Sequence, residues 1–418
     1  MDAYPEISEL GRRAQAAAVL LGRVPTETKD AALEAIAVAL EQQTERIVST
    51  NAQDVSKARE DGTNDHLLDR LSLSPQRVQS MAAAVRELIA LPDPVGEITE
   101  AWTRPNGLEL QKVRVPLGVV GMIYEARPNV TVDAATICLK SGNAVILRGS
   151  ASALATNTLL VELIDSTLRA VGLPAGCVNL VKDPDRQAVE AMMKARGSID
   201  VLIPRGGAEL IRRVVNGSTV PVLETGIGNC HVYIDSAADL AKALPITINS
   251  KIHRPSVCNA AESLLVHADI AREFLPEAGV RLQEAGVELR GCDRTRKLVG
   301  GVLKATEEDW SSEFLDLVMA VKVVDSIDDA IGHINFYGSG HTEAIVSEDE
   351  EALSRFAAEV DAAAITANAS TRFTDGNEFG YGAEIGISTQ KLHARGPMGL
   401  RELTSHKYLI RGDGQVRE

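Results

Sequence analysis

The first ninety positions carry apolar residues at helical spacing. Residues 7 to about 90 are predicted to be helical, with alanine-rich periodic segments at Lys29–Thr50 and Pro75–Leu91. Turns are expected at Asp61-Gly62 and at Leu91-Pro92-Asp93-Pro94, where glycine and proline interrupt the pattern. The amino-terminal part is therefore expected to be a set of packed helices.

The pattern changes to strict alternation over Glu97–Pro116. Two alternating segments flank Pro105-Asn106-Gly107, which is a strong signal for a β-hairpin. A hairpin this long either pairs across a subunit interface or is an ordinary surface hairpin, and the pattern favours neither.

From Pro116 onward, apolar strands alternate with helical segments. Strands are predicted at 117–125, 144–149, 178–181 and 200–207, and helices at 130–140, 155–171, 185–195 and 208–215. Strands alternating with helices of this length predict an α/β fold with a mostly parallel, doubly wound sheet. The segments PVLETG (221–226) and CHVYID (230–235) are expected to extend this sheet.

A second α/β unit is predicted after about residue 228. It comprises a helix at Leu240–Ser250, a loop with a cysteine, and strands at 263–267, 318–324 and 342–347. The tail from Gly396 to Glu418 ends in a strand-like segment, KYLIRG. The chain shows no internal repeat and no low-complexity linker.

Composition narrows the classes of function. Aromatic residues make up only 3% of the 418 residues, so the cores are built mainly from Ala, Val, Ile and Leu, which favours helices packed on buried strands. The net charge is -15. Such an acidic surface repels phosphate backbones and anionic membranes, so neither nucleic acid nor a membrane is expected as a partner. An anionic substrate would need a local pocket of arginine or lysine.

The cysteines favour a reducing compartment. Their number is five, which is odd, and no two form a CxxC pair, which argues against a disulfide framework and a structural zinc site. No metal site is expected. The amino-terminus lacks the features of a signal peptide, and no apolar run approaches the roughly 18–20 residues of a spanning helix. A cytoplasmic location is expected.

Cys258 is the cysteine most compatible with catalysis. It follows a predicted helix in HRPSVCNAAE, precedes the helix-compatible run Asn259-Ala260-Ala261, and has Lys251 and Arg254 just upstream. A helix amino-terminus and nearby cations lower a thiol pKa. The alternative is that Cys258, like most unpaired cysteines, is a small buried apolar residue.

Cys138, Cys177 and Cys292 lack a comparable pair of basic residues just upstream. Cys138 lies on the apolar face of a helix and is assigned to the core. Cys230 lies at a strand start, and His231 next to it faces the opposite side of the strand, so those two are not expected to pair.

Five motifs together resemble a known family. HRPSVCNAAE, YEARPNVT (124–131), VILRGS (145–150), LIPRGG (202–207) and GNCHVYID (228–235) occur in an order similar to that of the gamma-glutamyl phosphate reductases, a family within the aldehyde dehydrogenase superfamily. The resemblance covers essentially the whole chain.

The resemblance implies an aldehyde-dehydrogenase-like fold with three parts. Residues 1–96 and 117–227 would form the NADPH-binding domain, and residues 228–395 the catalytic domain with the nucleophilic cysteine. Residues 97–116 and 396–418 would form an oligomerisation element, so a homo-oligomer is expected.

The resemblance also implies a reaction. L-glutamate 5-phosphate would be reduced by NADPH to L-glutamate 5-semialdehyde and phosphate, in L-proline biosynthesis. A thiolate that first displaces phosphate as a thioester divides one difficult step into two. Cys258 would be that nucleophile, and the Asn129 side chain and the Cys258 backbone N–H would stabilise the oxyanion.

Some cofactor-binding residues are implied by the resemblance, and others are inferred from the sequence itself. No GxGxxG follows the first strand, but PRGG (Pro204 to Gly207) opens a helix and can present N–H groups to a pyrophosphate. Arg148, with Ser150 beside it, is the candidate for the 2′-phosphate of NADPH. By resemblance, Glu313 would hold the nicotinamide ribose. The cofactor-binding set is Arg148, Ser150, Arg205, Gly206, Gly207 and Glu313.

The substrate would need groups for a carboxylate, an ammonium and a phosphate. Arg127 and Arg254 are candidates for the anionic ends and Glu125 for the ammonium. Ser370 and Arg372 belong to a second polar loop that resembles a substrate loop of the superfamily. His341 is left without a role.

Three alternatives stay open. Glu224, in VLETG, lies where hydrolysing aldehyde dehydrogenases keep the glutamate that activates water, so an NAD(P)-dependent dehydrogenase that hydrolyses its thioester is the first. A non-catalytic dinucleotide-binding protein is the second. A cysteine hydrolase, for which His253 is too near in sequence to settle the question, is the third.

The chain is too short to hold a glutamate 5-kinase as well. The substrate would then come from a separate kinase, and because an acyl phosphate is labile, a transient hand-off complex with that kinase is a hypothesis.

Overall fold

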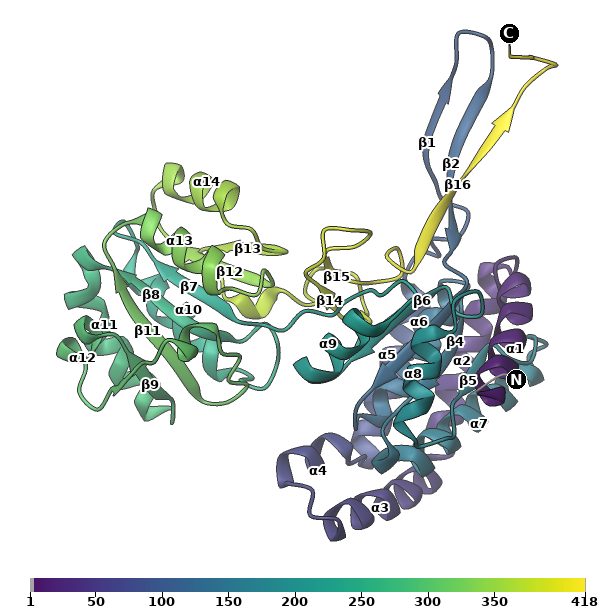
Figure 1. Cartoon of the computed structure of the whole chain (residues 1–418), viewed down its shortest axis with the longest axis horizontal. Helices are drawn as coiled ribbons and strands as arrows, with labels where there is room; N and C mark the ends of the chain where they lie inside the picture. The colour runs from purple at the N-terminus through teal and green to yellow at the C-terminus, as the bar shows by residue number, and fades with distance from the viewer. Residues whose placement is uncertain (1–3, 418) are drawn as a thin grey trace. The chain divides into compact units, whose positions relative to one another are not determined.

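Figure 1 shows the chain as a computed structural model, which describes residues 4–417 apart from the side chain of His66. Its internal contacts divide it into two compact units. Unit 1 comprises residues 4–224, 381–386 and 398–417, and unit 2 comprises residues 225–380 and 387–397. The functional roles expected for parts of the chain stay predictions.

Nine helices and a parallel sheet form the body of unit 1 within residues 4–224. The helices are α1 (Pro5–Leu21), α2 (Thr26–Gln42), α3 (Thr44–Glu60), α4 (Asp65–Leu71), α5 (Pro75–Ala90), α6 (Pro128–Lys140), α7 (Leu154–Ala170), α8 (Arg186–Lys194) and α9 (Ala208–Gly217). The strands are β3 (Val119–Tyr124), β4 (Ala144–Arg148), β5 (Val178–Leu180) and β6 (Val201–Arg205), in the spatial order β5-β4-β3-β6. All neighbours in this sheet are parallel. Every residue of β3 is buried, as expected of a central strand covered on both faces.

One predicted helix is in fact two. The segment Lys29–Thr50 was expected to be continuous, but α2 ends at Gln42 and α3 begins at Thr44. The Thr44 hydroxyl donates to the carbonyls of Leu40 and Glu41, at 3.1 and 2.9 Å. It thereby satisfies carbonyls that the end of α2 leaves without helical partners.

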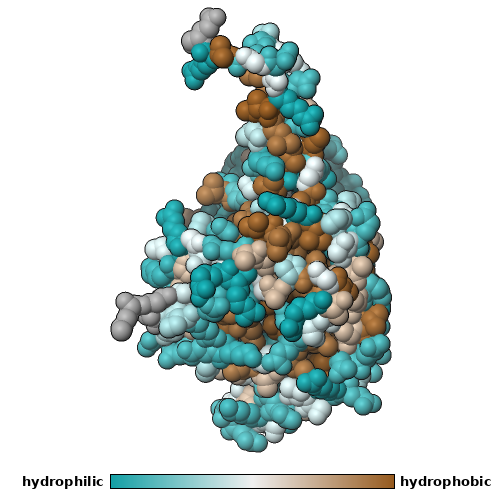
Figure 2. All heavy atoms as spheres, turned by 90° about the vertical axis from the view of Figure 1, so that its right-hand side faces the viewer, coloured by the Kyte–Doolittle hydropathy of each residue, from teal (hydrophilic) through white to brown (hydrophobic). Residues whose placement is uncertain are grey.

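A three-stranded antiparallel sheet projects from unit 1 (Figure 1). It contains β1 (Ile98–Thr103), β2 (Glu109–Pro116) and β16 (Thr404–Arg411), in the order β1-β2-β16. The hairpin and the carboxy-terminal strand thus pair directly. Apolar side chains gather along it in Figure 2, and those of Ile98, Trp102, Tyr408 and Ile410 are exposed.

Unit 2 is built on a seven-stranded parallel sheet, counted over its described residues. Its strands are β7 (Cys230–Ile234), β8 (Ala261–His267), β9 (Glu288–Gly291), β10 (Leu303–Lys304), β11 (Val318–Val324), β12 (Thr342–Val346) and β13 (Ala364–Ala367), in the order β10-β9-β11-β8-β7-β12-β13. Its helices are α10 (Leu240–Ile252), α11 (Ala268–Glu284), α12 (Asp293–Leu298), α13 (Ile327–Tyr337) and α14 (Glu350–Glu359). A short antiparallel pair, β14 (Ile387–Ser388) and β15 (Gly396–Pro397), also belongs to it.

Both faces of this sheet are covered. Val232 and Leu264 belong to a cluster with α10 and α11, whereas their neighbours Tyr233 and Leu265 belong to a cluster with α13 and α14. Successive side chains of a strand point to opposite faces, so each face has its own apolar layer. The predicted α/β fold is confirmed.

The segment CHVYID was assigned to the wrong sheet. It forms β7, which pairs with β8 and β12 of unit 2. Of PVLETG, Val222 makes an isolated parallel bridge with Leu202 at the edge of the unit 1 sheet. An apolar strand pattern reports burial but not the sheet that the strand joins.

A buried ion pair connects α2 to the segment that follows α5. Lys29 Nζ lies 2.8 Å from Asp93 Oδ2, with the Lys29 side chain fully buried and that of Asp93 almost so. Asp93 also accepts hydrogen bonds from Thr26 Oγ1 and from the Val95 N–H. The carboxylate therefore satisfies a buried cation and two further donors.

We expect Asp93→Ala to destabilise unit 1 by about 3–5 kcal/mol, because it leaves the Lys29 ammonium buried without its partner. Urea unfolding followed by circular dichroism measures this. Asp69→Ala, which breaks the exposed Arg77–Asp69 pair, is the matched control and should leave the midpoint unchanged. Equal shifts of the urea midpoint in the two variants would contradict a special stabilising role for the buried Lys29–Asp93 pair.

Candidate active site

Cys258 lies in the segment that connects α10 to β8, and its side chain is half-buried. The sequence predicted a helix after it. Instead, Asn259 and Ala260 complete a turn and Ala261 begins strand β8. No helix begins after Cys258, because the following residues enter the seven-stranded sheet of unit 2. The expectation that a helix amino-terminus lowers the Cys258 pKa is therefore wrong.

The backbone of Cys258 is held on one side by the segment that leads into β7. A Cβ atom built on Gly228 would lie 1.5 Å from the Cys258 carbonyl oxygen, so only glycine fits there. The Cys230 thiol donates to the same carbonyl oxygen at 3.2 Å. These two contacts fix the peptide that follows the candidate nucleophile.

Lys251 is not a free cation beside the cysteine. Its Nζ lies 2.5 Å from Glu262 Oε2, and both side chains are fully buried. Burial lowers the pKa of Lys251, and it raises the pKa of Glu262 to about 7 although the Lys251 charge opposes that rise. The sequence counted Lys251 as a basic neighbour of the thiol, but its charge is compensated by Glu262.

Two arginines predicted to bind substrate come together near Cys258. Burial lowers the pKa of Arg372, and the charges of Arg254 and Cys258 both lie near enough to its guanidinium to contribute to that pKa. The Arg372 Nε is buried and makes no hydrogen bond within the described residues. The charge of Asp375 also acts on Arg372, so two arginines and one carboxylate lie in the electrostatic surroundings of the thiol.

The loop that carries Arg372 is tied to α10 and to the cysteine segment. Ser370 Oγ lies 3.0 Å from Ser250 Oγ, and it accepts the Arg372 N–H. Asn259 Nδ2 donates to the Thr374 carbonyl at 2.8 Å. Ser370 is thus a residue that orders this loop.

Glu313 lies in the same neighbourhood. Its Oε1 accepts the Gly228 N–H at 2.6 Å, and burial raises its pKa against the effect of that hydrogen bond. Its predicted cofactor role stays a prediction.

In unit 1, a second set of candidates lies at the carboxyl ends of β3 and β6. Tyr124 and Arg205 are register partners at these ends. Glu125 follows β3, and its Oε2 accepts the Gly207 N–H at 3.0 Å, at the start of α9. The PRGG turn therefore binds a carboxylate oxygen through a backbone N–H. The sequence predicted that this turn presents N–H groups to an anion.

Arg127 and Asn129 lie at the start of α6. Arg127 is the residue that precedes the helix, and Asn129 Nδ2 donates to Asp133 Oδ2 at 3.0 Å. Burial raises the pKa of Asp133 to about 6, opposed by that hydrogen bond and by the charge of Arg205. The predicted roles of Arg127 and Asn129 stay predictions.

Arg148 ends β4, next to β3 in the sheet. Its guanidinium donates to the carbonyls of Gly149, Pro184 and Asp185, while its buried Nε makes no hydrogen bond among the described residues. The Ser150 hydroxyl contacts that of Ser152. A cation and two hydroxyls thus stand at the carboxyl edge of the sheet.

The remaining cysteines differ in acidity. Burial raises the pKa of Cys138, of Cys177 and of Cys230, the last to well above its ordinary value. For Cys292, burial acts in the same direction, but hydrogen bonds from Thr295 and from the Val323 N–H outweigh it and hold the pKa below its usual range. Experiments on Cys258 therefore need to separate it from Cys292.

His341 is a buried and weakly basic imidazole. It is fully buried, its Nδ1 lies 2.8 Å from Thr342 Oγ1 and 3.9 Å from Cys230 Sγ, and burial lowers its pKa to about 4. Among the described residues, no group of three or more His, Cys, Asp or Glu is placed to hold a metal ion.

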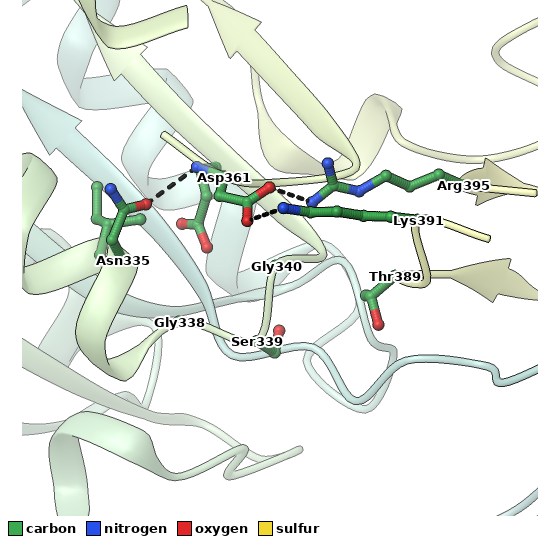
Figure 3. Close-up of a pocket in the computed structure, with 10 residues that line it drawn as sticks. Asn335, Gly338, Ser339, Gly340, Asp361, Thr389, Lys391 and Arg395 are labelled. Carbon is green, nitrogen blue, oxygen red and sulfur yellow. Dashed lines mark hydrogen bonds and ion pairs between the residues drawn. The ribbon is translucent and has the colours of Figure 1, made fainter. Parts of the chain in front are cut away.

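A cavity of about 250 Å³ lies elsewhere in unit 2 (Figure 3). Asp361 pairs there with Lys391 at 2.6 Å and with Arg395 at 2.7 Å. Its wall contacts the segment that leads into β7 through Ser339, whose Oγ accepts the Asn229 N–H at 3.0 Å. None of the residues predicted from the sequence lines this cavity.

Residues 3–309 match the aldehyde dehydrogenase family. The chain belongs to this family. Members of the aldehyde dehydrogenase family use a nicotinamide dinucleotide, NAD or NADP, as cofactor.

Several similar proteins carry the name gamma-glutamyl phosphate reductase. The chain is 56% identical over 416 residues to the gamma-glutamyl phosphate reductase of Thermobifida fusca, and 56% identical over 417 residues to that of Heliobacterium modesticaldum, with 100% of both chains covered in each case. The crystal structure of gamma-glutamyl phosphate reductase from Thermotoga maritima is 48% identical and has a TM-score of 0.97, covering 99% of this chain and 100% of that one. An acetylating aldehyde dehydrogenase from Geobacillus thermoglucosidasius, 18% identical with a TM-score of 0.69, shares the fold.

Sequence reasoning missed four residues that shape the site of this aldehyde dehydrogenase. These are Gly228, Cys230, Asn259 and Glu262. Glu262 carried a signal, because a charged residue within the apolar strand segment AESLLVH requires a buried partner. The others act through contacts that only the folded chain creates.

We expect Gly228→Ala to lower the rate of Cys258 alkylation by iodoacetamide, read peptide by peptide by mass spectrometry. The added methyl group displaces the Cys258 peptide, and a shift of about 1 Å costs on the order of 100-fold in a catalytic geometry. Gly332→Ala, where the new Cβ meets nothing within 4 Å, is the control. An unchanged Cys258 rate in Gly228→Ala would contradict the close approach.

Proposed function

We propose that the chain catalyses the NADPH-dependent reduction of L-glutamate 5-phosphate to L-glutamate 5-semialdehyde and phosphate, in L-proline biosynthesis. The observation that carries this proposal is the identity of 56%, over the full length, to gamma-glutamyl phosphate reductases. The half-buried Cys258 with Arg254 and Arg372 in its surroundings supports it.

In the proposed reaction, Cys258 is the nucleophile. Its thiolate attacks the acyl carbon, the S–C bond forms, the bond to the phosphate oxygen breaks, and phosphate leaves. The peptide N–H of Cys258 is one proposed donor to the oxyanion, and Asn129 is the other. Arg254 and Arg372 would hold the anionic groups of the substrate against the net charge of -15.

NADPH, when bound, supplies the two electrons that turn the thioester into aldehyde and free thiol. Two observations in unit 1 support a phosphorylated dinucleotide. The Gly207 N–H at the start of α9 binds the Glu125 carboxylate, whose place a phosphate oxygen would take, and Arg148 presents a guanidinium with an unpartnered Nε. Arg205, Gly206, Gly207 and Ser150 would contact the phosphates, and Glu313 the nicotinamide ribose.

The proposal extends to assembly and location. The exposed apolar side chains on the β1-β2-β16 sheet support a homo-oligomer formed through this sheet. Transient contact with a separate glutamate 5-kinase would protect the labile acyl phosphate. No helix among the described residues is long and apolar enough to cross a membrane. A cytoplasmic location is proposed because the five cysteines are unpaired.

The first test runs the reaction in reverse. Glutamate semialdehyde, NADP+ and phosphate are mixed, and NADPH absorbance is followed. We expect phosphate-dependent turnover that falls at least roughly 1,000-fold in Cys258→Ala, because the nucleophile is lost. Cys292→Ala, which removes the thiol whose pKa is held low by hydrogen bonds, should retain activity.

Two results would contradict the proposal. Phosphate-independent turnover would point to a hydrolysing dehydrogenase in which Glu224 activates water. An unchanged rate in Cys258→Ala would exclude the thioester route.

The cofactor preference has its own test. We expect Arg148→Ala to raise the KM for NADPH by roughly 10- to 100-fold, the usual effect of losing a charged hydrogen bond, and to leave the KM for NADH within about twofold. Arg186→Ala removes a neighbouring exposed cation and is the control. Equal effects on both cofactors in Arg148→Ala would contradict a contact with the 2′-phosphate.

A further inference from the structure

The buried pair Lys251–Glu262 spans the segment that carries Cys258. Lys251 lies in the last turn of α10 and Glu262 is the second residue of β8, eleven positions later. Both side chains are fully buried. The pair therefore joins the two ends of the cysteine segment.

A buried ion pair is seldom kept for stability alone, because apolar residues of similar volume often serve as well. Here the second carboxylate oxygen has its own task. Glu262 Oε1 accepts the Leu315 N–H at 3.1 Å. Leu315 has a φ of 54°, in the left-handed region that a leucine rarely adopts, so this turn needs an external contact to hold it.

The turn at Leu315 places the predicted cofactor residue. Glu313 is two residues earlier, and its carboxylate accepts the Gly228 N–H, while Gly228 lies against the Cys258 carbonyl. Contacts thus lead from Lys251 through Glu262 to Leu315, and from Glu313 through Gly228 to Cys258. The chain between Glu313 and Leu315 joins the two series.

We propose that Glu262 is a positioning residue. Lys251 compensates the buried charge of Glu262, Glu262 holds the Leu315 N–H, and the turn so fixed directs the Glu313 carboxylate toward the cofactor. This inference rests on the cofactor role of Glu313 proposed above.

Two double variants separate this role from simple stability. Lys251→Met with Glu262→Gln removes both buried charges but keeps an acceptor for the Leu315 N–H, whereas Lys251→Met with Glu262→Met removes the acceptor as well. Fluorescence titration with NADPH should give a Kd within about threefold of wild type for the first. The second should bind roughly 10-fold more weakly, because a buried N–H is left unpaired. The alkylation rate of Cys258 in the cofactor-free enzyme should fall only in the second.

A double-mutant cycle with Glu313→Ala tests whether Glu262 acts through Glu313. If it does, adding Glu313→Ala to the variant with Lys251→Met and Glu262→Met (Met/Met) weakens NADPH binding no further. Should Met/Met not fold, Glu262→Asp replaces it: the shorter side chain keeps the charge pair, loses the Leu315 contact and should weaken NADPH binding to the same extent.

The outcomes are distinct. If Glu313→Ala alone leaves the Kd for NADPH unchanged, the proposed role of Glu313 fails. If Glu313→Ala weakens binding but the loss of the Glu262 acceptor does not, or if the two losses add, Glu262 is merely structural and the inference is overturned.

Discussion

Gly228 lies so close to the Cys258 carbonyl that no side chain fits between them. The contacts around the Cys258 backbone in unit 2 depend on this approach. It requires that the segments before β7 and β8 run side by side, which the parallel pairing of those strands provides. It also leaves the Gly228 N–H pointing to Glu313 and brings the Cys230 thiol to the same carbonyl. The thiol is therefore presented by a backbone fixed from several directions.

The charges around this backbone oppose the charge of the whole chain. The net charge is -15, yet Arg254 and Arg372 lie in the surroundings of Cys258, and the lysine of that region is neutralised by its own glutamate. An anion near the thiol interacts more strongly with these nearby arginines than with the distant acidic surface. Salt screens the distant charges, and the low dielectric of the interior strengthens the close ones. An acidic protein can thus receive an anionic substrate.

Patterns of local spacing predicted the α/β class, the hairpin and most elements, since these depend on short-range periodicity. Features that depend on residues far apart in the sequence were harder to predict. Asn259 to Ala261 has helical propensity, but the apolar run that follows was drawn into the central sheet as β8. CHVYID was identified as a strand but not as a member of the second sheet. Cys258, Arg254 and Arg372 could be chosen by motif and chemistry, whereas Gly228 and Cys230 matter only through contacts across the fold.

The connectivity of unit 1 has a bearing on how the protein is made. Arg114 on β2 donates to the Arg401 carbonyl just before β16, 287 positions later, and β16 is the outer partner of β2. During synthesis, all of unit 2 leaves the ribosome before that strand does. While unit 2 is being synthesised, β2 therefore lacks its outer partner, so the unit that is begun first is completed only after the second.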